Sequence, residues 1–402
     1  MFTVLRLPGA TRAFLPSLLG RLALAMGGLA IVLAVQSHTG SFAAAGIAAG
    51  AFGFANVFAA PLRARAIDQW GQRRALTPLG LAQAAVFLGF AFATNTRGTS
   101  ALGFVALSAG AGLVAPPLGA SMRTIWTTLT TAGPQRTHAL SLDATADELV
   151  FIVGPLVAAA LATAFSPAYA LLAAATAVLA GTLGLISSRA SGSLRGAPAV
   201  AGRAERPLRR PGFIRVLVVL LGVGGVLGTI EITAPAVAVA AHDAAISGWL
   251  LAALSAGSAA GGLIYGHISW RGTLGSRMRV LAIAIGVLAC GIGLVNSVPG
   301  FAIGVAATGL FLAPSIITGY LAAEHLVPQH TLTEASVWTN TALNLGASIA
   351  NAIAGAIVAG PGVAWAMLAA GLFAILTATA TPRARLHTGG GQPAPSPSDP
   401  HL

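Results

Sequence analysis

The chain has 402 residues, of which 56% are hydrophobic and only 8% are charged, and its formal net charge at pH 7 is +12. So little charge cannot cover the surface of a soluble globular protein of this length, which excludes that class. The positive charge does not indicate a nucleic-acid-binding protein either, because the basic residues are scattered through short segments between apolar runs and form no continuous basic face.

Twelve apolar stretches, each close to the roughly 20 residues that a helix needs to cross a bilayer, follow one another along the chain. Their backbone amides must be satisfied within each segment, and the runs are too long for barrel strands, so the sequence predicts an all-α integral membrane protein. The first six spans are expected at residues 13–35, 41–60, 75–95, 99–121, 139–164 and 167–187. The second six are expected at residues 212–240, 245–267, 278–297, 299–322, 332–358 and 361–380.

All 22 basic residues are arginines, and they follow the spans in a regular alternation. All but two fall in or next to the gaps on one side of the series. Arg97 lies in an opposite-side loop and Arg21 lies inside the first span. Since cytoplasmic loops carry the excess of basic residues, both termini are expected in the cytoplasm, and the protein is expected in the bacterial inner (plasma) membrane.

The spans divide into two groups of six. We expect a six-helix bundle at residues 1–187, a cytoplasmic linker at 188–211, a second bundle at 212–380 and a disordered tail at 381–402. Residues also match between the halves at nearly constant offsets. The matches are Gly46 with Gly248, Phe104 with Phe301, Pro117 with Pro314, His138 with His330, and Gly154 with Gly346. They predict two six-helix pseudo-repeats with a substrate cavity at their interface.

The segment between the second and third spans carries one acid among several arginines. Asp68 can stabilise a helix N-terminus or pair with an arginine, and Gly71 permits a tight turn. Arg73 and Arg74 can anchor the segment at an anionic leaflet. A loop that only orients the chain would need the arginines but not the acid and the glycine at this spacing.

This loop resembles the signature of the major facilitator superfamily, Gly-x-x-x-Asp-x-x-Gly-x-Arg-Arg, with Ala64 in place of the leading glycine. The segments from Glu148 to Pro155 and from Glu334 to Trp338 resemble actinobacterial efflux-type members with twelve helices. The resemblance implies the fold of that superfamily and a loop whose Asp68, Gly71, Arg73 and Arg74 gate conformational exchange. In the second half, Trp270 stands where the repeat would place the acid.

Four acidic residues fall within apolar spans: Asp147, Glu148, Glu231 and Glu334. An ionised side chain at the bilayer centre costs about 2.5–3.5 kcal/mol, so such groups usually face a cavity or a partner, where a carboxyl group can load and release protons.

Glu148 is the first candidate for coupling or substrate contact, because it lies about 12 Å inside the fifth span. The alternative for Glu148 is a structural pair with an arginine such as Arg21. Glu231 is the second candidate, and Glu334 can simply stabilise a helix N-terminus. Asp143 is expected as a partner of the helix dipole in a first turn. Arg21 either snorkels to the interface or faces the cavity.

The pair Gly154-Pro155 resembles the glycine and proline motif of the superfamily's antiporters, and a proline there removes a helical hydrogen bond and bends the axis. Trp338 resembles a family position in the eleventh helix and is a candidate for substrate contact. The fourth span lacks a mid-helix arginine, since Arg123 follows Pro116-Pro117.

The sequence therefore predicts a monomeric secondary transporter that exports a small organic solute, such as a drug-like compound, a sugar or a metabolite, against proton entry by alternating access. Its partners are the small-molecule substrate, protons and the lipid bilayer, with no nucleic acid, no metal, no cofactor and no enzymatic activity. The alternative of the same fold is a solute uptake symporter or facilitator. A membrane-embedded transferase would need paired metal-binding acids, and a sensor would need a signalling domain.

Overall fold

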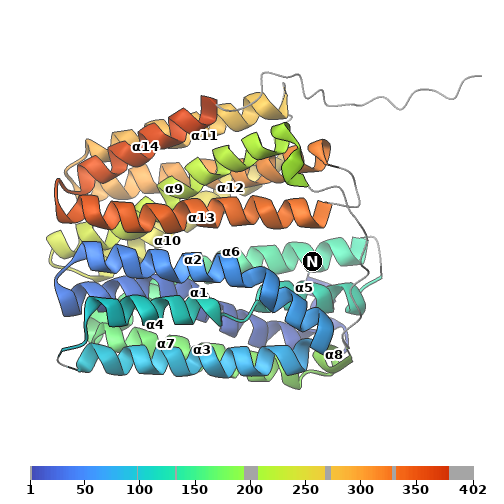
Figure 1. Ribbon diagram of the computed structural model, residues 1–402. Coiled ribbons are helices and arrows are strands. Elements are labelled where there is room, and N and C mark those ends of the chain that lie inside the picture. Colours follow the sequence, from blue (N-terminus) through green and yellow to red (C-terminus); the bar gives the residue numbers. More distant parts are fainter. Residues whose placement is uncertain are drawn as a thin grey trace, which may run out of the picture.

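The computed structural model describes residues 2–96, 98–131, 134–193, 207–267, 273–327 and 332–379. Throughout that part of the chain the regular secondary structure is helical, as predicted, and the long helices run roughly side by side (Figure 1).

The first half of the chain contains α1 to α8, and a short 3-10 helix, η1 (Phe2–Arg6), precedes them. The α-helices are α1 (Ala10–Thr39), α2 (Phe42–Trp70), α3 (Gln72–Asn95), α4 (Ala101–Leu113), α5 (Leu118–Leu129), α6 (Pro134–Ala164), α7 (Pro167–Ser187) and α8 (Arg189–Ser193).

The second half contains η2 (Pro207–Arg209) and six α-helices. These are α9 (Pro211–Ala240), α10 (Ala245–His267), α11 (Leu274–Gly293), α12 (Val298–Leu326), α13 (Leu332–Ala359) and α14 (Val363–Thr379).

Within the described residues, 11 helical stretches are long and apolar enough to cross a membrane, and α14 is a shorter apolar helix of 17 residues. They occupy the places of the twelve predicted spans. Many of their outward side chains are large and apolar: Phe92, Leu102 and Ile303 are 74%, 76% and 72% exposed. Apolar surface on this scale indicates a lipid-covered outer face.

Several predicted boundaries differ from the observed helix ends by a turn or more, and the ninth span is one example. The ninth span was expected at residues 278–297, but α11 spans Leu274–Gly293. It begins early because the hydroxyl of Thr273 accepts a hydrogen bond from the backbone N–H of Ser276 at 3.2 Å, which caps the helix ahead of its apolar part. Ser297 lies in the predicted span but caps the next helix in the same way. Hydropathy alone therefore misplaced a polar first turn.

The helices of each half pack mainly among themselves, and two pairs make the most extensive contacts between the halves. In the first half, α1 lies against α6 and α7; in the second, α9 lies against α13 and α14. Between the halves, α2 packs against α13 and α10 packs against α6. Figure 1 shows α2 and α13 alongside each other, with α2 turning away toward the end where the N-terminus lies.

The fourth span is broken between α4 and α5, and a buried arginine fills the break. Pro116 and Pro117 have no N–H groups to donate to the carbonyls four residues earlier. Arg63 of α2, only 6% exposed, donates from Nη1 to the carbonyl oxygen of Gly112 at 3.1 Å and to that of Ala115. Arg63 therefore has a structural task in addition to its contribution to the positive-inside pattern.

We expect Arg63→Ala to lower the thermal stability of the detergent-solubilised protein, because each carbonyl left buried without a donor costs about 1–3 kcal/mol. The measurement is the unfolding midpoint by intrinsic tryptophan fluorescence. Arg65→Ala is the matched control, because Arg65 is exposed on the same helix. Equal shifts for the two variants would contradict a structural role for Arg63.

Candidate functional site

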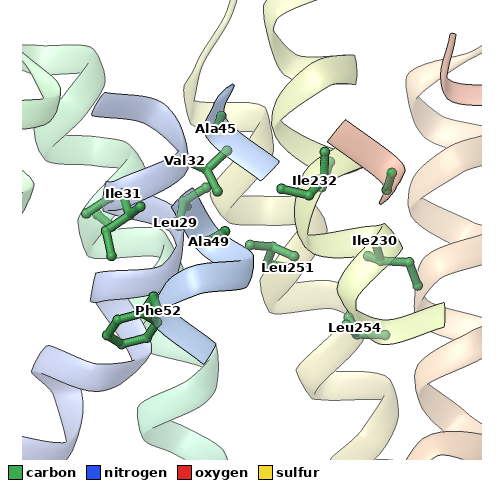
Figure 2. Packing of buried hydrophobic residues seen from close by; sticks show 14 of the residues in the cluster. Leu29, Ile31, Val32, Ala45, Ala49, Phe52, Ile230, Ile232, Leu251 and Leu254 are labelled. Carbon is green, nitrogen blue, oxygen red and sulfur yellow. The ribbon is translucent and has the colours of Figure 1, made fainter. Parts of the chain in front are cut away.

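A cavity of about 400 Å³ lies between the two halves, and both contribute to its wall. This volume is typical of a small-molecule site. Figure 2 shows part of the apolar lining, with Leu29 and Phe52 on helices of the first half and Leu251 and Leu254 on α10 of the second. The lining comes from α1, α2 and α6 on one side and from α9, α10, α12 and α13 on the other.

The two sides of this central cavity differ in polarity. Among its described lining residues, the first half contributes one polar side chain, Asn56. The second half contributes most of the polar groups: Glu231, Ser255, Ser258, Asn340, Asn344, Ser348 and Asn351. A bound molecule would therefore meet an apolar wall on one side and a wall of amides, hydroxyls and one carboxylate on the other.

Glu231 places a carboxylate in the cavity, in the middle of α9. Asn351 of α13 donates from Nδ2 to Glu231 Oε2 at 3.0 Å. The side chain of Asn351 is 5% exposed, while that of Glu231 keeps some exposure to the cavity. A hydrogen bond from an amide to a carboxylate holds the acid in place without neutralising it.

The hydrogen bond predicted to be missing at Pro155 leaves room for a polar contact between the halves. Pro155 cannot donate to the carbonyl of Phe151, four residues earlier in α6. The hydroxyl of Ser255, on α10, donates to that carbonyl oxygen at 3.3 Å. Phe151, Pro155 and Ser255 all line the cavity. The neighbouring Gly154 allows α6 to approach α1, since a Cβ there would lie 2.6 Å from that of Ala25.

Asn56 is oriented by the arginine of the α4–α5 break. Arg63 Nη2 donates to both the backbone oxygen and Oδ1 of Asn56, each at 2.7 Å. Because Oδ1 accepts from Arg63, the amide of Asn56 keeps its Nδ2 donor for other partners.

The two halves approach to backbone contact at several glycines. A Cβ at Gly50 of α2 would lie 2.7 Å from the carbonyl oxygen of Ser348 in α13, and one at Gly46 would meet the backbone of Asn351. Across the other pair, a Cβ at Gly248 of α10 would lie 2.8 Å from the carbonyl oxygen of Pro155. These contacts lie at the ends of the helices that are remote from the arginine-rich segments.

Arg21 belongs to an ion-pair cluster within the first half. Its guanidinium lies 2.8 Å from Asp143 Oδ1 and 3.3 Å from Asp147 Oδ1, and Arg123 lies 3.4 Å and 3.3 Å from the other oxygens of the same acids. Arg21 is 6% exposed and Asp143 is 1% exposed. Two arginines therefore neutralise two aspartates and join α1, α5 and α6.

This cluster corrects two expectations. Asp143 is not a first-turn partner of a helix dipole, because α6 begins at Pro134 and Asp143 is buried against Arg21. Arg21 is held by the two aspartates and is not among the described residues that line the cavity. Its partners are Asp143 and Asp147, and the side chain of Glu148, the expected alternative partner, lies outside the described part of the structure.

The predicted turn at Gly71 is confirmed. Gly71 has φ 80° and ψ 160°, which is accessible in practice only to glycine, and it separates α2 from α3. Arg73 is exposed and donates from Nε to the carbonyl oxygen of Ile186 at the end of α7 at 3.1 Å, and Arg74 is exposed. The side chain of Asp68 lies outside the described residues.

Of the remaining candidates, Trp338 is not among the described residues that line the cavity. Trp338 packs with the apolar residues Phe213, Ala323 and Ala335 where α9, α12 and α13 meet. Glu334 lies in the first turn of α13, and its side chain is not described.

Sequence reasoning missed the amides of the cavity. Asn340, Asn344, Ser348 and Asn351 recur at intervals of four, four and three residues, which places them on one face of α13. This periodicity of polar residues within an apolar span was the available signal. Asn56 gave no such signal, because its place depends on Arg63.

Comparison with solved structures places the fold among membrane transporters. An auto-inhibited POT family peptide transporter aligns with a TM-score of 0.72 at 12% identity, covering 96% of this chain and 99% of that chain. A mutant of the nucleoside transporter NupG aligns at 0.72 and 14% identity, covering 93% and 98%. The human organic anion transporter MFSD10 (TETRAN) aligns at 0.59 and 17% identity, with the same coverage.

A comparison with curated protein sequences finds no match. The family model of the Major Facilitator Superfamily matches residues 14–269, which is more than half of the chain. The chain therefore belongs to the Major Facilitator Superfamily, and it is a multi-pass membrane transporter protein by family.

Proposed function

We propose that this protein is a secondary active transporter that exports a small organic molecule in exchange for protons by alternating access. The observation that carries the proposal is the central cavity, which both halves line and which holds the carboxylate of Glu231. A site between two bodies can be exposed to either side of the membrane when they rock against each other. Because one chain builds the whole cavity, we propose a monomer, located in the bacterial plasma membrane.

Matching glycine contacts support two six-helix pseudo-repeats. In each half, a glycine of the second span contacts the fifth span of the other half. Within each half, a glycine of the fifth span contacts the first span, and a glycine of the fourth span contacts the second span. The matching pairs are Gly46 and Gly248, Gly154 and Gly346, and Gly112 and Gly309. Two of these pairs, Gly46 with Gly248 and Gly154 with Gly346, also align in sequence. The two halves therefore correspond both in residue type and in the helices that these glycines contact.

The conformation is best interpreted as open toward the cytoplasm. The glycine-mediated contacts join the halves at the end remote from the arginine-rich segments. The excess of arginine in those segments supports their assignment to the cytoplasm, with both termini on that side. Opening to the outside then requires α2 to separate from α13 and α10 from α6.

The segment at Asp68, Gly71, Arg73 and Arg74 is proposed as the cytoplasmic gate. The glycine turn and the bond from Arg73 to α7 support a joint whose contacts can break and reform as the halves rock. The cluster of Arg21, Asp143 and Asp147 is better suited to holding the first half rigid during that movement, because its charges balance.

Glu231 becomes the first choice for proton coupling, ahead of Glu148. It lines the cavity and has an amide partner, and a protonatable carboxyl group in a water-accessible cavity can exchange protons on either side. Glu148 stays a candidate on its depth in α6 alone.

We expect Gly50→Val to shift the protein toward an outward-open state, because the added side chain cannot fit against the backbone of α13. The measurement is labelling of Asn344→Cys, in the cavity, by a membrane-impermeant maleimide added from each side. The background variant is Cys290→Ser, which removes the one native cysteine. Labelling from the outside should rise and labelling from the cytoplasmic side should fall.

Gly291→Val is the matched control, since a Cβ at Gly291 meets nothing within 4 Å. An unchanged labelling pattern in a folded Gly50→Val variant, or the same change in both variants, rules out the proposed movement.

We expect Glu231→Gln to abolish substrate-driven proton movement in proteoliposomes while leaving substrate exchange measurable, because the amide keeps a similar shape but takes up no proton. A pH dye inside the vesicles follows protons across a panel of compounds, and labelled substrate follows exchange. Glu324→Gln is the control, since Glu324 is an exposed carboxylate on α12. A parallel Glu148→Gln variant tests the second candidate.

Proton movement that persists in Glu231→Gln but stops in Glu148→Gln returns the coupling role to Glu148. Substrate transport without proton movement in the native protein defeats the coupling proposal, and the sign of the pH change distinguishes export from uptake.

A further inference from the structure

The central cavity has a corner where hydrogen-bond acceptors outnumber donors. An ionised carboxylate can accept about four hydrogen bonds, and one to Glu231 is present, from Asn351 Nδ2. That bond fixes the amide of Asn351, so its Oδ1 faces elsewhere. Among the described residues, Asn351 Oδ1 is buried and has no hydrogen-bond partner.

The backbone adds a further acceptor at the same turn of α9. Pro235 lies four residues after Glu231 within the helix. Because proline has no N–H, the carbonyl of Glu231 lacks the donor that a regular helix supplies. The side chain and the backbone of one residue therefore both offer oxygen lone pairs.

No positive charge balances this corner among the described lining residues. The side chains that α1, α2, α6, α10, α12 and α13 contribute to the cavity are apolar, proline, serine or asparagine, so Glu231 is the one titratable group in the described lining. The contrast with Arg21 is direct, since that buried arginine is matched by two aspartates. Glu231 therefore needs a proton or a bound cation when it is enclosed.

We propose that this corner binds the cationic end of an amphipathic substrate, such as a protonated amine or another organic cation. The apolar body of the substrate would lie against Leu24, Leu29 and Phe52 on the first-half wall. Asn56 offers a donor to an acceptor elsewhere on the molecule, since Arg63 holds its Oδ1. An anionic substrate would be repelled by Glu231 and would find no basic side chain in the described lining.

This inference rests on the proposed function and gives it a physical basis for exchange. A proton and an organic cation both neutralise the same carboxylate, and they cannot do so together. Loading a proton therefore weakens binding of the cation, and release of the proton restores it. Two ligands that compete for one group are carried in opposite directions by a protein that alternates between sides.

The test is equilibrium binding to the full-length, detergent-solubilised protein, using three molecules with one aromatic body: naphthylmethylamine, naphthylmethanol and naphthoate. Each displaces radiolabelled tetraphenylphosphonium, a bulky organic cation. We expect the amine to bind about tenfold or more tightly than the alcohol, as a charge-assisted hydrogen bond provides, and naphthoate to bind least. The affinity of the amine should fall as the pH is lowered toward protonation of Glu231.

Glu231→Gln should remove both the preference for the amine and its dependence on pH, while binding of the alcohol is retained, which also reports that the variant is folded. Asn351→Ala should weaken binding of the amine more than that of the alcohol. Glu324→Gln, which removes an exposed carboxylate from α12, should change neither the preference for the amine nor its dependence on pH.

The inference is overturned if no cation binds, if the alcohol or naphthoate binds as tightly as the amine, or if the preference survives in Glu231→Gln. Because this is a binding experiment, its failure leaves the alternating movement untouched. That movement is tested separately by the labelling of the Gly50→Val variant.

Discussion

A backbone carbonyl buried inside a bilayer must find a donor within the protein, and this requirement organises the polar interior of the chain. Prolines interrupt several helices, and each removes an N–H that a carbonyl one turn earlier would have used. Where Pro116 and Pro117 break the fourth span, Arg63 donates to the carbonyl oxygens of Gly112 and Ala115. Where Pro155 interrupts α6, Ser255 supplies one from the other half. The partners of these freed carbonyls lie at or beside the cavity wall, so satisfying the backbone also builds the site.

The two halves differ in how their buried charges are balanced. In the first half, Arg21 and Arg123 pair with Asp143 and Asp147, so the four charges of this cluster sum to zero. In the second half, Glu231 has an amide partner and no cation among the described residues of the cavity. The first arrangement suits a rigid body, and the second suits a group whose charge changes during a cycle.

The sequence predicted the fold closely, because hydrophobic length and arginine spacing are one-dimensional signals with direct physical causes. The helices follow from hydrophobic length, the turn at Gly71 follows from the backbone freedom of glycine, and the family signature points to the same fold. The sequence predicted the candidate site less well than the fold. Glu231 was ranked below Glu148 because depth along a helix can be counted, whereas the side of the helix that meets a cavity depends on neighbours from the other half. Asp143 was misjudged for the same reason, since its partner lies 122 residues away.

The glycines at the contacts between the halves connect these features to movement. At Gly46, Gly50 and Gly248 the helices of opposite halves approach to backbone contact, which adds dispersion contacts but few fixed side-chain interlocks. Separating such surfaces costs less free energy than withdrawing interdigitated side chains. A small difference in free energy elsewhere in the protein can therefore set the balance between the joined and separated states of the halves. Neutralising Glu231 supplies a difference of that kind, because enclosing a neutral group is far cheaper than enclosing an ion. In the proposed cycle, a proton or a cation on this carboxylate therefore lowers the cost of closing the halves around the cavity.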